Sequence, residues 1–182
     1  MIVVMGIDPG VANTGFGVVR VAGARMGAVD GGVIDAPPGE RPEERLARIH
    51  RQLVELLAWH EPHAVALEDV YFGKNIRSAM AVGQARGVAM LAAAERGVAC
   101  FDYTPQAVKM SVCGTGSADK KQVQRMVGAL LGLPGPPQSD HAADALAVAI
   151  CHASQARGSS PLAGAGSAAR IAAPLGQGAS AG

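Results

Sequence analysis

The stretch IVVMGIDPG (residues 2–10) starts as an apolar run, reaches a carboxylate at Asp8 and then turns at a Pro-Gly pair. A short run of this kind, rich in β-branched residues, predicts a buried β-strand. A carboxylate at the end of a buried strand is costly unless it is paired or binds a cation. Because Asp is also common in turns, this stretch leaves Asp8 open between a turn cap and a ligand for a cation or a metal-bound phosphate.

The segments that follow predict an α/β fold. Residues 14–21 and 25–35 read as two more strands with short links, which indicates an antiparallel meander whose Gly-rich third strand lies at or near an edge. Two later apolar runs predict a fourth and a fifth strand, at residues 62–70 and 98–103. Periodicity and end signals predict helices at residues 41–60, 75–97, 104–112, 118–133 and 139–154. This order predicts a mixed five-stranded sheet flanked by helices.

Length and composition suit one domain followed by a tail. The chain has 182 residues, of which 49% are hydrophobic, so residues 1–157 can bury a substantial core. Residues 158–182 are rich in Gly, Ala, Ser and Pro, which predicts a disordered tail. Three widely spaced cysteines without zinc spacing predict a reduced, cytoplasmic protein. We expect no membrane span, because no uncharged apolar run reaches about 18 residues.

Charge is distributed unevenly along the chain. Residues 1–70 hold 6 Lys/Arg against 10 Asp/Glu, whereas residues 71–125 hold 8 against 3. An acidic segment beside a basic one fits a metal site that meets a polyanion, although ordinary solvated surface charge explains the same numbers.

Acidic residues are expected to meet at the ends of two strands and one helix. Asp8 ends the first strand, Glu68 and Asp69 end the fourth, and Asp144 lies in the first turns of the last helix with His141 on the same face. Alternation along a strand lets only one of Glu68 and Asp69 point inward, and the small neighbours Ala64 and Ala66 weakly favour Glu68.

A cluster of carboxylates and imidazole favours hard divalent cations. Like charges a few ångströms apart raise each other's pKa unless cations neutralise them, and Mg²⁺ and Mn²⁺ prefer oxygen ligands. Two such ions can activate a water and stabilise the leaving oxygen of a phosphodiester, with His141 as a ligand or general base. Taken singly, each residue has a plainer explanation: helix capping for Asp140, with Ser139 as the other candidate cap, helix-dipole compensation for Asp144, a structural role for His141 and a surface position for Glu68.

These motifs together resemble the RuvC family of bacterial Holliday-junction resolvases. The blocks that carry the resemblance run in order from about Ile2 to His152: GIDPG, TGFGVV, EDVYFGKNIRSAMAVGQARG, GTGSADKKQVQRMV and HAADALAVAICH. The resemblance implies an RNase H-like fold, a homodimer and metal-dependent nicking of four-way DNA junctions in recombination and repair. It places Asp8, Glu68, His141 and Asp144 in the catalytic metal site, with two Mg²⁺ or Mn²⁺ ions, and leaves Asp140 as the helix cap. The RuvA–RuvB branch-migration complex is the further partner that it implies.

DNA contacts are expected from the basic middle of the chain. Lys109, Lys120 and Lys121 flank a glycine-rich loop that can offer backbone N–H groups to phosphate. Tyr71 and Phe72 follow Glu68 and can either stack on an opened base or anchor the loop in the core. The remaining candidates for phosphate contact are Lys74, Asn75 and Arg77.

Gly83 and Gly87 lie four residues apart on the long helix, which fits close packing of that helix on its own sheet or on a second copy.

Two other functions compete with a nuclease. A kinase-like or ATPase-like domain also begins with GxDxG after a strand, and a DNA-structure-binding protein could retain the fold without cleavage.

Overall fold

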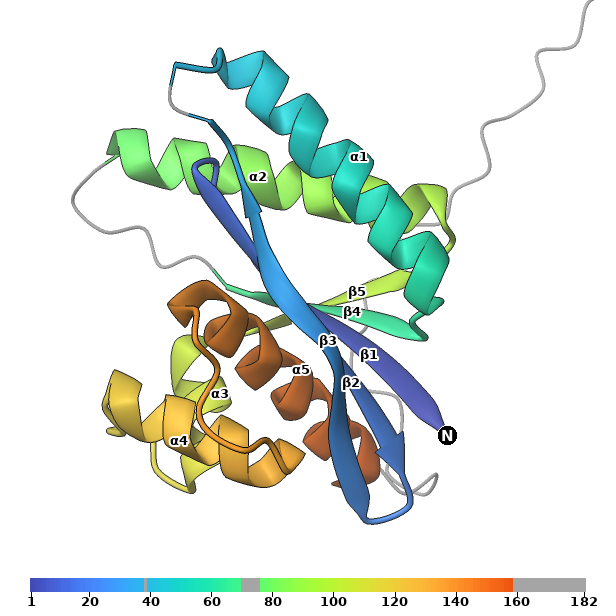
Figure 1. Cartoon of the computed structure of the whole chain (residues 1–182), viewed down its shortest axis with the longest axis vertical. Coiled ribbons are helices and arrows are strands. Elements are labelled where there is room, and N and C mark those ends of the chain that lie inside the picture. The colour runs from blue at the N-terminus through green and yellow to red at the C-terminus, as the bar shows by residue number, and fades with distance from the viewer. Residues whose placement is uncertain (38, 70–75, 159–182) are drawn as a thin grey trace, which may run out of the picture.

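The computed structural model describes residues 1–37, 39–69 and 76–158, and its five strands form one mixed sheet. The spatial order is β3-β2-β1-β4-β5 (Figure 1). Strands β1, β2 and β3 form an antiparallel meander, while β4 runs parallel to β1 and β5 parallel to β4. Their bounds are Ile2–Asp8 (β1), Asn13–Ala22 (β2), Arg25–Asp35 (β3), Ala64–Glu68 (β4) and Ala99–Tyr103 (β5). The predicted mixed sheet and the edge position of the third strand are confirmed.

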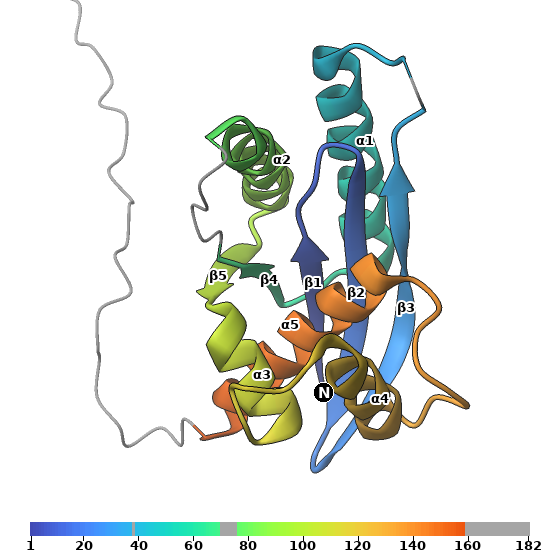
Figure 2. The ribbon, with the colours of Figure 1, turned by 90° about the vertical axis from the view of Figure 1, so that its left-hand side faces the viewer.

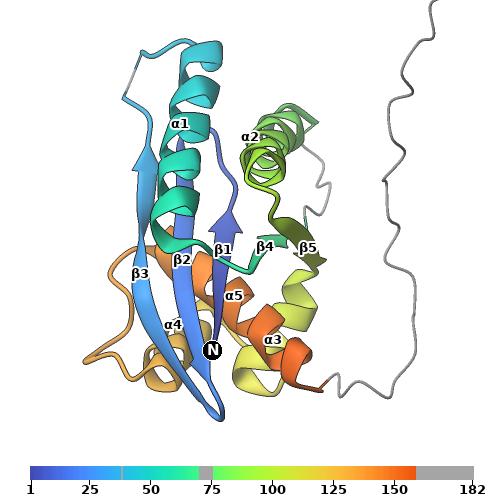
Figure 3. The same cartoon turned by 90° about the vertical axis from the view of Figure 1, so that its right-hand side faces the viewer.

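Helices cover both faces of this sheet. Helices α1 and α2 lie on one face, and α3, α4 and α5 lie on the other (Figures 2 and 3). Their bounds are Pro42–His60 (α1), Ile76–Glu95 (α2), Pro105–Cys113 (α3), Lys120–Leu131 (α4) and Asp140–Gly158 (α5). None of the helices in the described part of the chain has the length and apolarity needed to cross a bilayer. The proposed disordered tail, apart from Gly158 at the end of α5, lies outside the described residues.

The helix starts follow local capping rules, with one correction. Thr104 caps α3 by accepting a hydrogen bond from the Ala107 N–H, as its sequence predicts. Two caps are expected for α5, Ser139 and the preferred Asp140, and Asp140 is wrong. The Ser139 hydroxyl accepts from the Ala142 N–H at 3.4 Å, and Asp140 lies inside the first turn with its carboxylate directed at α4.

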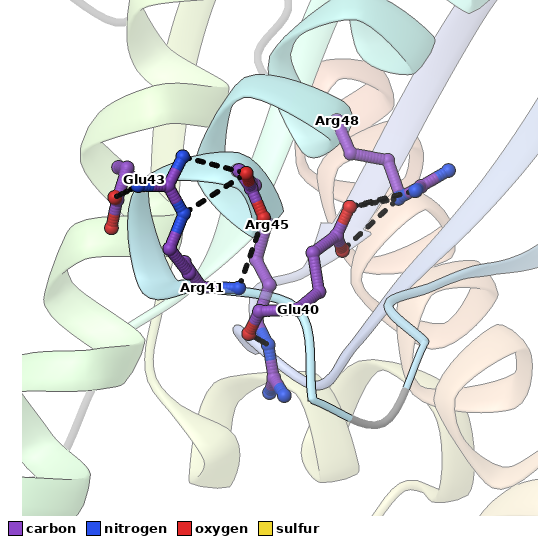
Figure 4. A network of polar contacts seen from close by, with 6 residues as sticks. Glu40, Arg41, Glu43, Arg45 and Arg48 are labelled. Atoms are coloured by element: carbon purple, nitrogen blue, oxygen red, sulfur yellow. Dashed lines mark hydrogen bonds and ion pairs between the residues drawn. The ribbon is translucent and has the colours of Figure 1, made fainter.

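A network of charged side chains fixes the start of α1 on the side of the sheet away from α5 (Figure 4). The Glu40 carboxylate accepts from the Arg48 guanidinium at 2.7 Å, and its backbone carbonyl accepts from Arg45. Arg41 pairs with both Glu43 and Glu44. These local contacts stabilise the start of α1.

Side-chain alternation divides the core into two layers. On β1, Met5 and Ile7 pack with α1 and α2, whereas Val4 packs with α3, α4 and α5. On β4, Val65 and Leu67 face α1 and α2 in the same way. The α5 face therefore receives the alternate positions, and these end in carboxylates on both strands.

Three glycines allow α5 to lie almost against the backbone of β1 and β2. A Cβ atom at Gly6 would stand 1.9 Å from the Ala145 carbonyl oxygen, and one at Gly15 would stand 2.1 Å from the His141 carbonyl oxygen. Gly6 and Gly17 are direct partners across the two strands, and a Cβ at Gly17 would collide with Leu146. Only glycine fits at these positions, so they set how deeply α5 sits on the sheet.

We expect Gly15→Ala to destabilise the protein by about 1–3 kcal/mol, because the added methyl group must displace the α5 backbone at His141. Urea unfolding measures this loss. Gly27→Ala is the matched control, since a Cβ at Gly27 meets nothing within 4 Å and should change stability by no more than about 0.5 kcal/mol. Equal stability of the two variants would contradict the close-approach argument.

Candidate functional site

Strands β1 and β4 bring Asp8 and Glu68 to the same edge and face of the sheet. The two strands are parallel neighbours, and the last residues paired between them are Ile7 and Leu67. The next residue on each strand is the carboxylate, and both carboxylates share the face of Val4 and Ala66, which pack on the α5 side. Asp69 is exposed and its backbone N–H donates to the Tyr103 carbonyl, so the preference for Glu68 over Asp69 agrees with the structure.

Helix α5 adds His141 and Asp144 to this edge. The His141 Nδ1 atom lies 2.8 Å from a carboxylate oxygen of Asp8, which joins the helix directly to the end of β1. Asp144 follows three residues later, on the same face of α5. The depth set by Gly15 and Gly6 makes this contact possible, because it holds the first turns of α5 against the tips of both strands.

Burial and neighbouring negative charge raise the pKa values of Glu68 and Asp144. Burial raises the pKa of Glu68 to about 7, and the negative charges of Asp8 and Asp144 add to this effect. The pKa of Asp144 is also raised, first by burial and further by Asp8, against an opposing effect of Lys120. Acidic groups with raised pKa values at one end of a sheet are typical of functional sites.

Two lysines border the acidic residues. The Lys120 ammonium lies 3.3 Å from an Asp144 oxygen and 3.2 Å from an Asp140 oxygen. Lys109 and Lys120 line a cavity of about 230 Å³ together with Glu68 and Asp144. The sequence predicts only DNA contacts for these lysines, whereas the structure places Lys120 in contact with one of the predicted catalytic acids.

The donor set fits divalent cations in its chemistry but is not arranged as a finished ligand cage. Within the described residues, no group of three or more His, Cys, Asp and Glu side chains stands ready-made around a metal position. Two contacts explain this: His141 is bonded to Asp8, and Lys120 is paired with Asp144. Oxygen-rich groups whose like charges raise each other's pKa are what Mg²⁺ or Mn²⁺ would stabilise, so the residues fit such ions once these contacts are exchanged.

The predicted DNA-contact residues are only partly placed by the structure. Arg77 on α2 and Lys121 on α4 are exposed. The other four predicted contacts lie outside the described residues: Tyr71, Phe72, Lys74 and Asn75.

Arg86 is a residue near the site that sequence analysis missed. Its guanidinium donates to the Glu68 backbone carbonyl at 3.0 Å and pairs with Asp102 on β5. Arg86 thereby fixes the end of β4 from the α2 side. The available signal was a lone arginine among small residues on the face of α2 that turns toward the sheet.

Comparison with known proteins gives consistent matches over most of the chain. The family model described as "Crossover junction endodeoxyribonuclease RuvC" matches residues 4–152. The protein of that name from Pelotomaculum thermopropionicum is 52% identical over 150 residues, which cover 82% of this chain and 92% of the relative. That from Rubrobacter xylanophilus is 51% identical over 151 residues, covering 83% and 84%. A solved Thermus thermophilus RuvC in complex with a Holliday junction substrate aligns with a TM-score of 0.82 at 41% identity, over 86% of this chain and 96% of that chain.

The raised pKa of Glu68 predicts how the metal-free protein responds to pH. The folded protein holds the Glu68 proton up to about pH 7, whereas a glutamate in the unfolded chain has its ordinary pKa of 4.5, so stability falls as pH rises between these values. We expect Glu68→Gln to raise the melting temperature at pH 8 in the presence of a chelator, and the gain to shrink toward pH 5. Differential scanning calorimetry at both pH values measures it.

Glu55→Gln, which removes an exposed acid on α1, is the control for the loss of one negative charge. A Glu68→Gln protein that is no more stable than the unmodified protein at pH 8 would show that Glu68 carries no electrostatic strain.

Proposed function

Because this chain belongs to the RuvC family of crossover junction endodeoxyribonucleases, we propose that it resolves four-way DNA junctions at a site formed by Asp8, Glu68, His141 and Asp144. It hydrolyses one phosphodiester bond in each of two opposing strands and leaves 5′-phosphate and 3′-hydroxyl ends. The observation that supports this proposal is that His141 on α5 contacts Asp8 at the end of β1, while the charges of Asp8 and Asp144 act on Glu68 at the end of β4. A junction-binding protein without cleavage would have no need for this costly set of acids.

The site is metal-dependent, and we assign two Mg²⁺ or Mn²⁺ ions to Asp8, Glu68, His141 and Asp144. When bound, such ions activate a water for attack on phosphorus and stabilise the leaving oxygen. Glu68 holds a proton near neutral pH in the metal-free protein, and it releases that proton as it becomes a ligand. His141, once its contact with Asp8 is exchanged, serves as a ligand or as a general base.

The basic groups beside the site supply the phosphate contacts. Lys109 and Lys120 border the cavity that opens at Glu68 and Asp144, so a phosphate near the acids also meets their ammonium groups. Lys121 and Arg77 are exposed and extend the basic surface. We also propose that Tyr71 and Phe72 stack on an opened base and that Lys74 and Asn75 contact phosphate groups.

A stripe on α2 that is exposed among the described residues supports a homodimer built on this helix. Residues at alternating spacings of four and three along α2 are apolar or glycine and are exposed: Ile76, Met80, Gly83, Gly87 and Met90. A Cβ at Gly83 or Gly87 would meet nothing within 4 Å, so these glycines do not serve packing on the chain's own sheet. This spacing is typical of a helix that packs along a second helix, and a two-fold pair would present two sites to two opposing strands.

The RuvA–RuvB complex is proposed as a further partner on the family resemblance alone. The kinase-like or ATPase-like alternative loses its support, because its evidence was the GxDxG turn and this turn belongs to a family of nucleases.

Asp8→Asn is expected to reduce cleavage of a synthetic four-way junction by at least about 10³-fold while junction binding persists. The substitution keeps the shape of the side chain but removes the charge that holds the cation. Cleavage in Mg²⁺ and gel-shift affinity in Ca²⁺ measure the two effects separately.

Asp69→Asn is the matched control, since Asp69 is an exposed acid at the end of β4 next to Glu68 and should retain cleavage. Full cleavage by the Asp8→Asn protein, or equal losses in both variants, would contradict catalysis at this site.

Gly83→Glu is expected to weaken dimerisation by at least about 100-fold, because it places a charge on the α2 stripe opposite its symmetry mate. Glu favours a helix over Gly, so a loss of helix cannot explain a monomer. Sedimentation velocity measures the change, with Ala47→Glu on the exposed face of α1 as the control. An unchanged dimer would place the interface elsewhere.

A further inference from the structure

The ammonium of Lys120 is shared between two carboxylates of α5. Its Nζ atom lies 3.2 Å from an Asp140 oxygen and 3.3 Å from an Asp144 oxygen. Asp140 is also held from α4 by Gln124, whose amide donates to its other carboxylate oxygen at 2.6 Å. Lys120 and Gln124 are four residues apart and so occupy one face of α4, directed at the first turn of α5.

This sharing matters because Asp144 is a proposed ligand for a divalent cation. An ammonium and a divalent cation cannot both neutralise the same carboxylate at close range, since their positive charges repel one another. In the metal-free protein, Lys120 therefore occupies the carboxylate that a cation would bind. How strongly Lys120 opposes cation binding depends on whether its ammonium has another acceptor to move to.

We infer that Asp140 is a positioning residue that takes over the Lys120 ammonium when a divalent cation binds Asp144. The inference rests on the proposed function, because it assumes cation binding at Asp144. Asp140 itself needs no contact with the cation or the DNA. It acts through Lys120. It draws the ammonium away from Asp144 and keeps that positive charge beside the first turn of α5.

The geometry suits such a transfer. The two oxygens are at nearly equal distances from Nζ, so the ammonium can lean toward Asp140 without a shift of α4. Gln124 keeps the Asp140 carboxylate in place while the ammonium moves. Asp140 lies one helical turn before Asp144 and is the more exposed of the two, with 62% against 31% of the side chain accessible. Its carboxylate therefore stays ionised at low energetic cost.

The electrostatics of the surrounding groups point the same way. Burial tends to lower the pKa of Lys120, but its hydrogen bonds with Asp140 and Asp144 outweigh burial and raise the pKa. Lys120 is thus charged while it pairs with these two carboxylates. Lys109 and Glu68 also face this cavity, so a lysine released without a second acceptor would stand beside a cation and another ammonium.

The test is Mn²⁺ binding to the full-length protein without DNA, measured by isothermal titration calorimetry on a double-mutant cycle. We expect Asp140→Asn to weaken Mn²⁺ binding about three- to fivefold, because Lys120 then rests on Asp144 alone. Lys120→Ala should tighten binding, because the competitor is gone. The double variant should match Lys120→Ala within about twofold, which is the non-additivity expected of residues acting through one another.

Two comparisons separate this role from a structural one. Glu43→Gln removes an exposed acid on α1 and should leave Mn²⁺ binding unchanged. Gln124→Ala breaks the same α4–α5 contact but keeps both carboxylates, so it should weaken binding less than Asp140→Asn does.

An equal loss from Asp140→Asn with and without Lys120, or no loss at all, would overturn the inference while leaving the metal site intact. Failure of the proposed function is a different result. In that case Mn²⁺ would not bind the unmodified protein, or would bind the Asp8→Asn protein equally well.

Discussion

Helix α5 lies so close to β1 and β2 that a methyl group at Gly6 or Gly15 would enter its backbone. This close packing is what turns three separate element ends into one site. The helix carries His141 to within hydrogen-bond distance of Asp8, and the parallel pairing of β1 and β4 sets Glu68 beside them. A helix seated farther out would leave the acids on their own elements, each with an ordinary surface role.

The metal-free protein balances this gathering of negative charge with its own groups. Glu68 retains a proton to about pH 7, His141 bonds Asp8, and the Lys120 ammonium pairs with Asp144. Under the proposed function, a divalent cation would take the place of these three interactions: Glu68 would give up its proton, His141 its contact with Asp8, and Lys120 its contact with Asp144 in favour of Asp140. The metal-free site would then be electrostatically tolerable, and a bound cation would make it favourable.

The sequence carried the fold and the core of the site because both depend on local patterns. Alternation on β1 and β4, the spacing of His141 and Asp144 and the helix signals predicted the elements of the sheet and the acids at their ends, and the family resemblance selected the set of four site residues. The sequence did not predict contacts between side chains and groups on other elements of the fold. Asp140 reads as a helix cap by composition, yet Ser139 holds that position and Asp140 turns to Lys120 and Gln124 on another helix. Likewise, no periodicity indicates that Arg86 binds the Glu68 carbonyl, because this contact joins α2 to the end of β4. Gly6, Gly15 and Gly17 permit the close approach of α5. Paired glycines on adjacent strands indicate that some element comes close, but they do not identify which one.

The central claim is that Asp8, Glu68, His141 and Asp144 bind divalent cations together. A crystal structure of the protein grown in Mn²⁺, with anomalous scattering recorded, tests it most directly. The account predicts anomalous peaks at the carboxylate edge of β1 and β4, with oxygen atoms of Asp8, Glu68 and Asp144 at about 2.0–2.3 Å from the ions and the Lys120 ammonium away from Asp144. Anomalous peaks only elsewhere on the protein, with Lys120 still paired to Asp144, would contradict it.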